Sequence, residues 1–232
     1  MKRCLLFILI LFFSITVQAM SSYTASYELY SKTDLGNLKV GNAKFELTVA
    51  NNAYVFSSVA TTDTLWEALY DYSRNETSIG LIVDNKLTSS YYKIIENQPN
   101  SVADNYEINI YPDEYYASLN NEIKWKIDSG EIVDELSIYL HISEDIQKFP
   151  DKKVFSYHIV GKKGIREQKF TIDGNETISV RNKEAETIRI ICPELRLIFN
   201  VSKDYNFMPV LISKTNGKHK YILTLKEFKK QS

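Results

Sequence analysis

The sequence predicts a mostly β protein: a large curved antiparallel sheet or an open β-barrel with two short helices. Three observations predict it. Apolar and polar residues alternate with a period of two along most of the chain, as in half-buried strands. Turn-forming residues separate these stretches with no helical crossover after each, which favours antiparallel pairing. The chain also contains 16 Tyr and 11 Phe, which are residue types that favour strands.

The first 19 residues have the pattern of a secretory signal peptide. Basic residues 2–3 precede an apolar run over residues 4–13, and residues 17–19 end the segment with a signal-peptidase pattern. The run is too short for a membrane span, which needs about 20 apolar residues. Cys4 lies at the beginning of this run and not at its end, so it is not placed as a lipid attachment site. We expect cleavage after Ala19 and no membrane span in the remaining chain.

The composition excludes several classes of protein. The 28 Lys and Arg nearly balance the 29 Asp and Glu, which argues against a nucleic-acid binder that neutralises phosphates. A hydrophobic content of 44% argues against disorder. Two cysteines exclude a disulfide scaffold and a multi-cysteine metal site. Cys192, the cysteine left after cleavage, follows two isoleucines, so we expect a buried side chain more than a reactive thiol.

Residues 20–232 read as a single β-rich domain, because no Pro- or Gly-rich linker divides them. The expected strands cover 23–29, 43–49, 54–61, 75–83, 87–95, 106–111, 115–119, 123–127, 154–160, 165–172, 176–180, 185–192, 195–201, 210–214 and 221–228. The turns are predicted at 84–85, 120–121, 161–164, 173–175, 181–183, 202–204 and 216–217, the last with the strongest signal. A sheet of so many strands curls or splits into layers, and curling gives it a concave side.

Two segments show helical spacing instead. Thr64 and Glu67 form the pattern of a capping box, and the apolar residues that follow at helical spacing are Leu65, Trp66, Leu69 and Tyr70. The second helix is predicted from the spacing of Ile132, Val133, Leu136, Tyr139 and Leu140, with Asp134 or Asp128 as candidate caps.

The sequence contains no recognisable catalytic or cofactor motif. It lacks G-x-S-x-G, H-E-x-x-H, P-loop and G-x-G-x-x-G patterns. Its three histidines, His141, His158 and His219, are far apart in sequence, and the acidic pairs lie in or beside turns, where solvated carboxylates are expected. We therefore expect no catalytic residues, no metal site, no cofactor and no enzymatic activity.

The candidate ligand-binding residues are aromatic or lie beside the first helix. They are Trp66, Tyr70, Tyr72, Arg74 and Trp125. In one interpretation the helix plugs a barrel end and its aromatic side chains fill the core. In the other the helix covers an apolar cavity, with Arg74 near the mouth. Trp125, on a strand between two lysines, permits the same two interpretations.

An ordered set of short motifs spans nearly all of the chain after the leader. They are Tyr23-Thr-Ala-Ser-Tyr27, Gly41-x-Ala43-x-Phe45, Tyr54-x-Phe56, Asp134-Glu-Leu-Ser137, Phe155-x-Tyr157, Gly174-x-Glu176-Thr177 and Asn206-Phe-Met-Pro209-Val210. With this set the chain resembles the exported bacterial proteins grouped as domain of unknown function 3108. The resemblance implies a β-rich domain in the periplasm of a Gram-negative bacterium and supplies no activity.

Two functions fit these expectations. The first is a non-catalytic periplasmic carrier whose curved sheet encloses a lipid or another amphipathic envelope component, since wide antiparallel barrels can hold ligands. The alternative is an envelope assembly protein that binds a protein partner through a sheet edge or an aromatic patch. Neither hypothesis involves nucleic acid.

Overall fold

The computed structural model describes residues 20–34, 36–63, 71–84, 86–98, 104–217 and 219–231. These residues form one helix, α2 (Ile138–Lys148), and two 3-10 turns, η1 (Pro112–Glu114) and η2 (Lys203–Tyr205). Their strands are β1 (Tyr23–Thr33), β2 (Gly36–Ala50), β3 (Ala53–Thr62), β4 (Ser73–Val83), β5 (Lys86–Asn97), β6 (Asn105–Tyr111), β7 (Tyr116–Leu119), β8 (Ile123–Lys126), β9 (Ile132–Asp134), β10 (Val154–Gly161), β11 (Gly164–Val180), β12 (Lys183–Cys192), β13 (Leu197–Ser202), β14 (Met208–Asn216) and β15 (His219–Lys230). The predicted signal peptide and the helix predicted over 64–70 lie outside the described residues.

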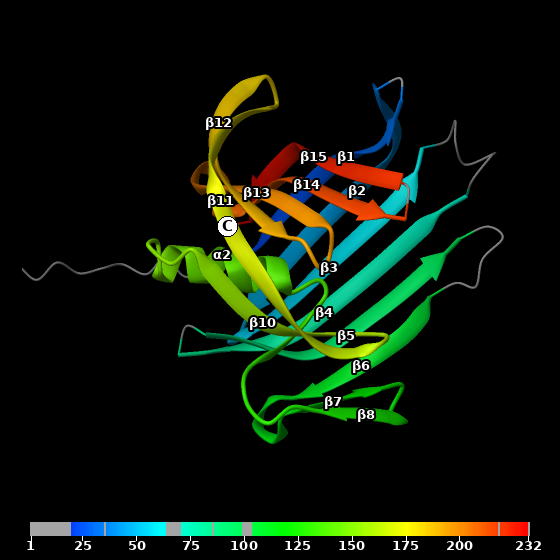
Figure 1. Ribbon diagram of the computed structural model, residues 1–232, viewed down its shortest axis with the longest axis vertical. Helices are drawn as coiled ribbons and strands as arrows, with labels where there is room; N and C mark the ends of the chain where they lie inside the picture. The colour runs from blue at the N-terminus through cyan, green and yellow to red at the C-terminus, as the bar shows by residue number, and fades with distance from the viewer. Residues whose placement is uncertain are drawn as a thin grey trace, which may run out of the picture.

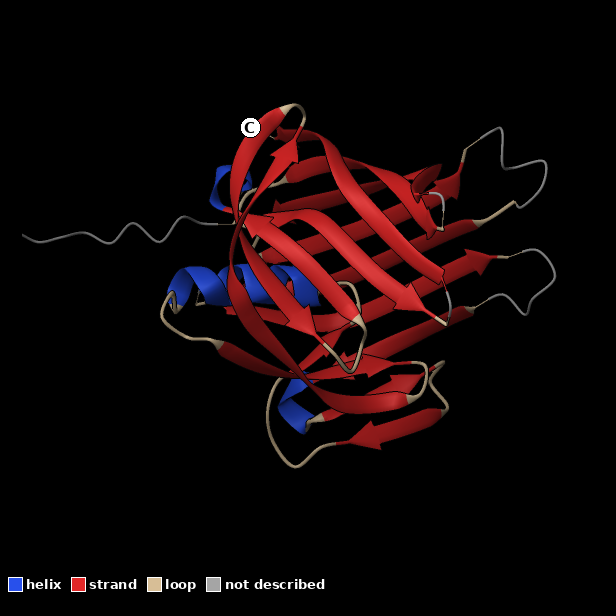
Figure 2. Cartoon of the chain, turned by 45° about the horizontal axis from the view of Figure 1, so that its top comes forward, coloured by secondary structure: helices blue, strands red, loops and turns tan. Residues whose placement is uncertain are grey.

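The fold-class prediction is confirmed: the 15 described strands make one sheet in the order β8-β7-β6-β5-β4-β3-β2-β1-β15-β14-β13-β12-β11-β10-β9. All neighbours pair antiparallel except β9 and β10, which are parallel. The sheet curls until its end strand β9 lies against β5, and β6, β7 and β8 continue beyond this seam (Figure 1). The result is a barrel-like wall with α2 on its inside (Figure 2).

The period-two pattern turns one face of each strand towards this interior. Tyr23, Ala25 and Tyr27 of β1 are buried, while the residues between them are only partly covered. Tyr139 of α2 joins opposite walls of the barrel, because its ring centroid lies 6.2 Å from that of Phe45 on β2 and 5.4 Å from that of Phe199 on β13. The helix therefore fills the part of the interior that it crosses.

Two predicted turns differ in detail from the structure. The segment 173–175 is a register shift within the continuous strand β11, with Gly174 at φ 112°, so the two strands expected there are one. A bulge accommodates the extra residues without ending the pairing with β12. At the other site Asn216 pairs with His219, so Asn216 belongs to the strand pair and not to the turn predicted at 216–217.

The second predicted helix begins later than its spacing indicated. Ile132 and Val133 belong to β9, which pairs with β10, and α2 starts at Ile138. Both residues are buried, and over so few residues an apolar spacing does not distinguish strand from helix. Asp134 does accept hydrogen bonds from the backbone amides of Leu136 and Ser137, so it caps the turn that leads into α2.

Candidate functional site

Two clusters of polar residues bear on the function of the barrel. One is a partly exposed cluster of charged side chains around Arg74, which we call the charged hollow; it comprises Arg74, Glu76, Glu96 and Glu135 with nearby tyrosines. The other is a fully buried network around Asp134, which we call the Asp134 network. The first contains charges that a ligand can reach, whereas the second holds α2 to the sheet.

The residue spacing on β4 and the register of β4 with β5 bring the charges of the hollow together. Arg74 and Glu76 are two residues apart on β4, so their side chains stand on the same face. The Nε of Arg74 lies 3.0 Å from Oε2 of Glu76, and its Nη2 lies 3.0 Å from Oε1, which makes a bidentate pair. Glu96 of β5 is directly opposite Arg74 in the register, with 3.7 Å between the guanidinium and the carboxylate. Glu135 reaches the same guanidinium at 3.9 Å from the turn before α2.

Tyrosines complete the wall of the charged hollow. The hydroxyl of Tyr72 donates to Glu96 at 2.8 Å, and that of Tyr92 donates to Glu76 at 2.5 Å. The rings of Tyr92 and Tyr106 meet edge to face with centroids 6.2 Å apart. Tyr92 is 0% and Tyr106 is 6% exposed, so these two rings pack behind the carboxylates, and the Tyr92 hydroxyl holds Glu76 in place.

The carboxylates of the hollow differ in how well they are compensated. Burial alone would raise the pKa of Glu76, but the bidentate Arg74 and the Tyr92 hydroxyl lower it below its usual value. The pKa of Glu135 is raised by partial desolvation from the atoms packed around its carboxylate, and Lys214 and Arg74 offset this only in part. Glu135 is thus the acid that has most to gain from a further hydrogen-bond donor or positive charge.

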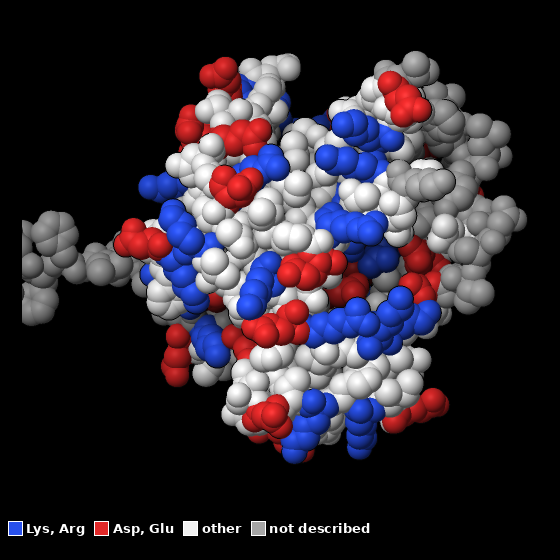
Figure 3. Space-filling model, in the orientation of Figure 1, with Lys and Arg blue, Asp and Glu red and all other residues white. Residues whose placement is uncertain are grey.

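These charged groups remain accessible from outside. The exposed fraction of the side chain is 25% for Arg74 and 39% for Glu135, and it is 13% for Glu76 and 12% for Glu96. Figure 3 shows a hollow right of the centre of the view, with acidic and basic atoms inside it and Lys and Arg along its borders. Gly161 of β10 faces Glu135, where an added Cβ would lie 2.5 Å from a carboxylate oxygen. The Glu135 side chain therefore packs directly against the bare backbone of Gly161, and a larger residue there would displace the carboxylate.

The Asp134 network links the start of α2 to β3, β4 and β5. Asp134 is fully buried and accepts from the hydroxyls of Ser78 and Ser137 at 2.6 and 2.7 Å, besides the two backbone amides. The Ser89 hydroxyl lies 2.8 Å from that of Ser137 and 3.1 Å from the Tyr54 hydroxyl. Burial raises the pKa of Asp134, and its four donors counteract that rise. The network satisfies polar groups that would otherwise be buried without partners.

A Ser–His–acid arrangement occurs at the edge of this network. His141 Nε2 is 3.4 Å from the Ser89 hydroxyl and its Nδ1 is 3.3 Å from Glu131. Burial lowers the pKa of His141 to about 3, so the imidazole is neutral and its contact with Glu131 is not an ion pair. Ser89 is 0% exposed and His141 is 4% exposed, so no substrate can reach the hydroxyl. We interpret this arrangement as structural.

The sequence-predicted site residues separate in the structure. Tyr72 and Arg74 both belong to the charged hollow. Trp125 is partly buried and packs at 3.5 Å from the Cβ position of Gly164, and no contact among the described residues joins it to Arg74. Trp66 and Tyr70 lie outside the described residues.

Sequence reasoning missed the three glutamates of the hollow. The spacing of Arg74 and Glu76 on one strand was a usable signal, because alternate residues share a face. Glu96 and Glu135 could be found only through the register of β4 with β5 and the position of the turn before α2.

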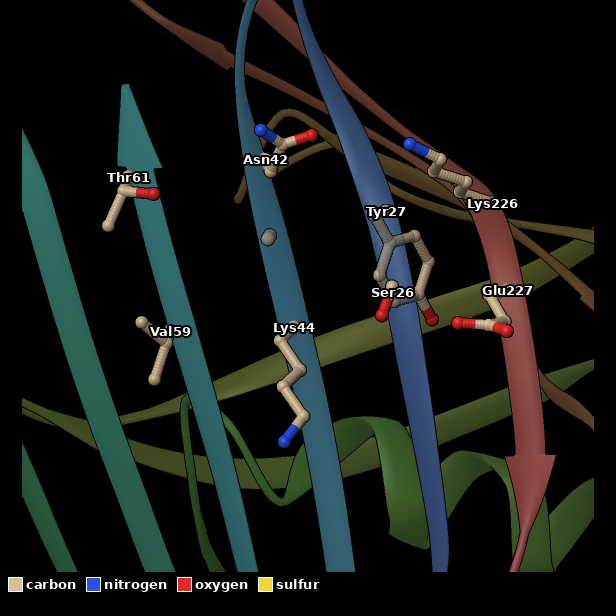
Figure 4. A pocket seen from close by; sticks show the side chains of 9 residues that line it. Ser26, Tyr27, Asn42, Lys44, Val59, Thr61, Lys226 and Glu227 are labelled. Carbon is tan, nitrogen blue, oxygen red and sulfur yellow. The ribbon is translucent and has the colours of Figure 1, made fainter. Parts of the chain in front are cut away.

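Two further depressions lie on the outer surface. The first, of about 340 Å³, lies over β1, β2, β3 and β15 and is lined by Ser26, Tyr27, Asn42, Ala43, Lys44, Val59, Thr61, Lys226 and Glu227 (Figure 4). Its charged side chains have partners on their own or neighbouring strands: Lys44 lies 2.6 Å from Glu46, and Lys226 lies 3.8 Å from Glu28. The second, over β12, β13 and β14, has a volume of about 510 Å³.

Neither a membrane helix nor a metal cluster is present in the described ranges. No helix there is long and apolar enough to cross a bilayer. No group of three or more His, Cys, Asp or Glu side chains in those ranges is arranged to hold a metal ion.

Comparison with known proteins defines the fold. No family model matches the chain, and no curated protein matches it. A crystal structure from Brucella abortus, described as a beta-barrel-like protein of domain of unknown function DUF1849, superposes with a TM-score of 0.58. The match covers 92% of this chain and 99% of that one at 7% sequence identity. The chain thus has a barrel-like fold similar to that of a protein of unknown function, and no comparison shows membership of domain of unknown function 3108.

Proposed function

We propose that the protein is a non-catalytic binder or carrier of a lipid or other amphipathic envelope molecule, whose polar head occupies the charged hollow. The observation that carries the proposal is the placement of Glu135: a carboxylate that is 39% exposed, held inside a barrel among tyrosines, with its nearest cation 3.9 Å away. Charge placed in such a setting has a desolvation cost that a bound ligand can offset.

The charges of the hollow favour a head group that donates hydrogen bonds or carries positive charge. Three glutamates surround one arginine, and the bidentate contact with Glu76 already occupies much of the guanidinium. A ligand ammonium would find Glu135 and Glu96 as partners. A ligand carboxylate would meet like charges instead.

The role of a carrier is consistent with the groups present. Carboxylates, phenols and a guanidinium bind through charge and hydrogen bonds, and the serine–histidine pair of the interior is too deeply buried to act on a ligand. Export to the periplasm, cleavage after Ala19 and membership of domain of unknown function 3108 remain parts of this proposal.

Isothermal titration with two probes of equal chain length tests the head-group preference. We expect octylammonium to bind one per protein and more tightly than octanoate, and Glu135→Gln to weaken octylammonium roughly tenfold, as for loss of a charged hydrogen bond. Glu184→Gln is the matched control, since Glu184 is exposed on β12, and it should bind like the wild type. Absence of binding by both probes, or equal loss in both variants, would contradict the proposal.

Binding of a protein partner by strand addition is the second candidate. β8 is an end strand of the sheet, and its Ile123 is 51% exposed. The strand has only four residues, and Lys124 and Lys126 lie on it; short strands and lysines are common means of preventing edge pairing. The hollow therefore supports the carrier hypothesis more strongly than this edge supports a partner.

A further inference from the structure

The second outer depression, which we call the basic groove, lies on the opposite side of the sheet from the charged hollow. Its walls come from β12, β13 and β14 and the beginning of β15, and its volume is about 510 Å³. That volume falls within the usual range for small-molecule sites. In Figure 3 this face is turned to the viewer, with uncharged atoms over the middle of β13 and β14 and Lys and Arg side chains beside them.

One row of the groove is cationic and hydroxyl-bearing. The Thr215 amide donates to the Arg196 carbonyl at 3.1 Å, and Thr215 is directly opposite Lys220 in the register of β14 and β15. Arg196, Thr215 and Lys220 therefore lie side by side across three segments, and all three line the groove. Neither Arg196 nor Lys220 forms an ion pair with any of the residues that the structure describes.

The neighbouring row is apolar around one hydroxyl. Ile191 of β12 is opposite Ile198 of β13, which is opposite Ser213 of β14. Ser213 is 6% exposed, and its hydroxyl makes no side-chain hydrogen bond within the described part of the chain. An apolar strip thus runs directly beside a positive one.

A third cation at the groove is already compensated. Arg189 lies 3.0 Å from Asp173 and 3.6 Å from Glu176. Asp173 is the one acid of the groove lining, and it faces Arg189, so the charges of Arg196 and Lys220 remain available to a ligand.

We propose that the basic groove binds the phosphate head group of an anionic phospholipid at a membrane surface, with Arg196 and Lys220 on the phosphate and the isoleucines against the adjoining carbon atoms. A soluble phosphate would leave the apolar row in water, whereas a lipid covers both rows. Anionic bilayers attract such cations at about 1 kcal/mol each. The inference is independent of the ligand in the charged hollow, because it concerns the outer face of different strands.

Vesicle flotation of the purified protein tests the groove. The probes are vesicles of phosphatidylcholine alone and of phosphatidylcholine with phosphatidylglycerol, and the variant is Arg196→Gln with Lys220→Gln. We expect binding only to the anionic vesicles and a loss of roughly 30-fold in the partition constant of the variant, from two cations.

The matched control is Arg181→Gln with Lys183→Gln; Arg181 lies in the exposed turn between β11 and β12, and Lys183 is the exposed first residue of β12. This control also removes one arginine and one lysine. Its arginine has a positive φ of 53°, close to the φ of 48° at Arg196, so the two arginines are replaced in a similar backbone conformation. The control should bind like the wild type. Three results would overturn the proposal. The first is an equal loss of vesicle binding in both double variants, and the second is no binding of the wild type to anionic vesicles. The third is competition by soluble glycerol phosphate that is as strong as competition by lipid.

Discussion

Replacement of Asp134 by alanine tests the physical account of how α2 is held in the barrel. The side chain accepts four hydrogen bonds of 2.6–2.9 Å at a site with 0% exposure. In Asp134→Ala the hydroxyls of Ser78 and Ser137 can turn towards Tyr54 and Ser89, but the amides of Leu136 and Ser137 lose their acceptor. Two buried amides without partners cost about 2–6 kcal/mol.

The loss of the buried carboxylate offsets part of this destabilisation, because burial disfavours the ionised carboxyl. We therefore expect Asp134→Ala to lower the free energy of unfolding by about 3 kcal/mol, and Asp134→Asn, which keeps an oxygen for both amides, by about 1 kcal/mol. Urea unfolding followed by circular dichroism measures both, with Asp151→Ala in an exposed turn as the control. Equal effects of alanine and asparagine, or a loss for alanine below about 1 kcal/mol, would refute the reasoning.

Three more predictions concern other buried positions. The pKa of His141 is about 3 in the folded protein and about 6.5 in the unfolded chain. The free energy of unfolding of the wild type should therefore fall, relative to that of His141→Gln, by about 1.4 kcal/mol per pH unit below a pH of about 6.5. Urea midpoints of the two proteins that change by the same amount from pH 7 to pH 5 would contradict this. Gly80→Ala places a Cβ 2.2 Å from the Thr88 carbonyl oxygen and 2.5 Å from the Tyr54 ring, so we expect a loss of about 3 kcal/mol in thermal unfolding, and an unchanged melting temperature would oppose this. Cys192 is 0% exposed and burial raises its thiol pKa, so a thiol reagent should label it only after unfolding; rapid labelling of the native protein would show the packing to be wrong.

Features that depend on neighbouring residues could be predicted from the sequence. Alternation placed most strands within a few residues of their observed bounds, as for β3, predicted over 54–61 and observed over Ala53–Thr62. Burial of Cys192 followed from its apolar setting and is confirmed. The turn at Arg181 and Asn182 is confirmed by φ values of 53° and 62°, since side chains that tolerate positive φ mark such turns.

Features that depend on the closure of the barrel could not be predicted. Ile132 and Val133 are in a strand only because β10 pairs with them. The residues next to them in the sequence do not indicate this pairing. The hollow shows the same limit: Arg74 was a candidate, but Glu96 joins it through the pairing of β4 with β5, and Glu135 joins it through the return of the chain into the barrel.

Native mass spectrometry of the protein purified without denaturation tests the carrier proposal most directly. We expect a fraction of the wild type to carry a bound amphipathic molecule, and we expect Gly161→Val, whose side chain would displace the Glu135 carboxylate, to lose it. Lys44→Gln in the outer depression should retain it, because Lys44 lies on the other face of the sheet. A wild-type protein without any bound molecule, or a Gly161→Val protein that carries as much as the wild type, would contradict a ligand in the charged hollow.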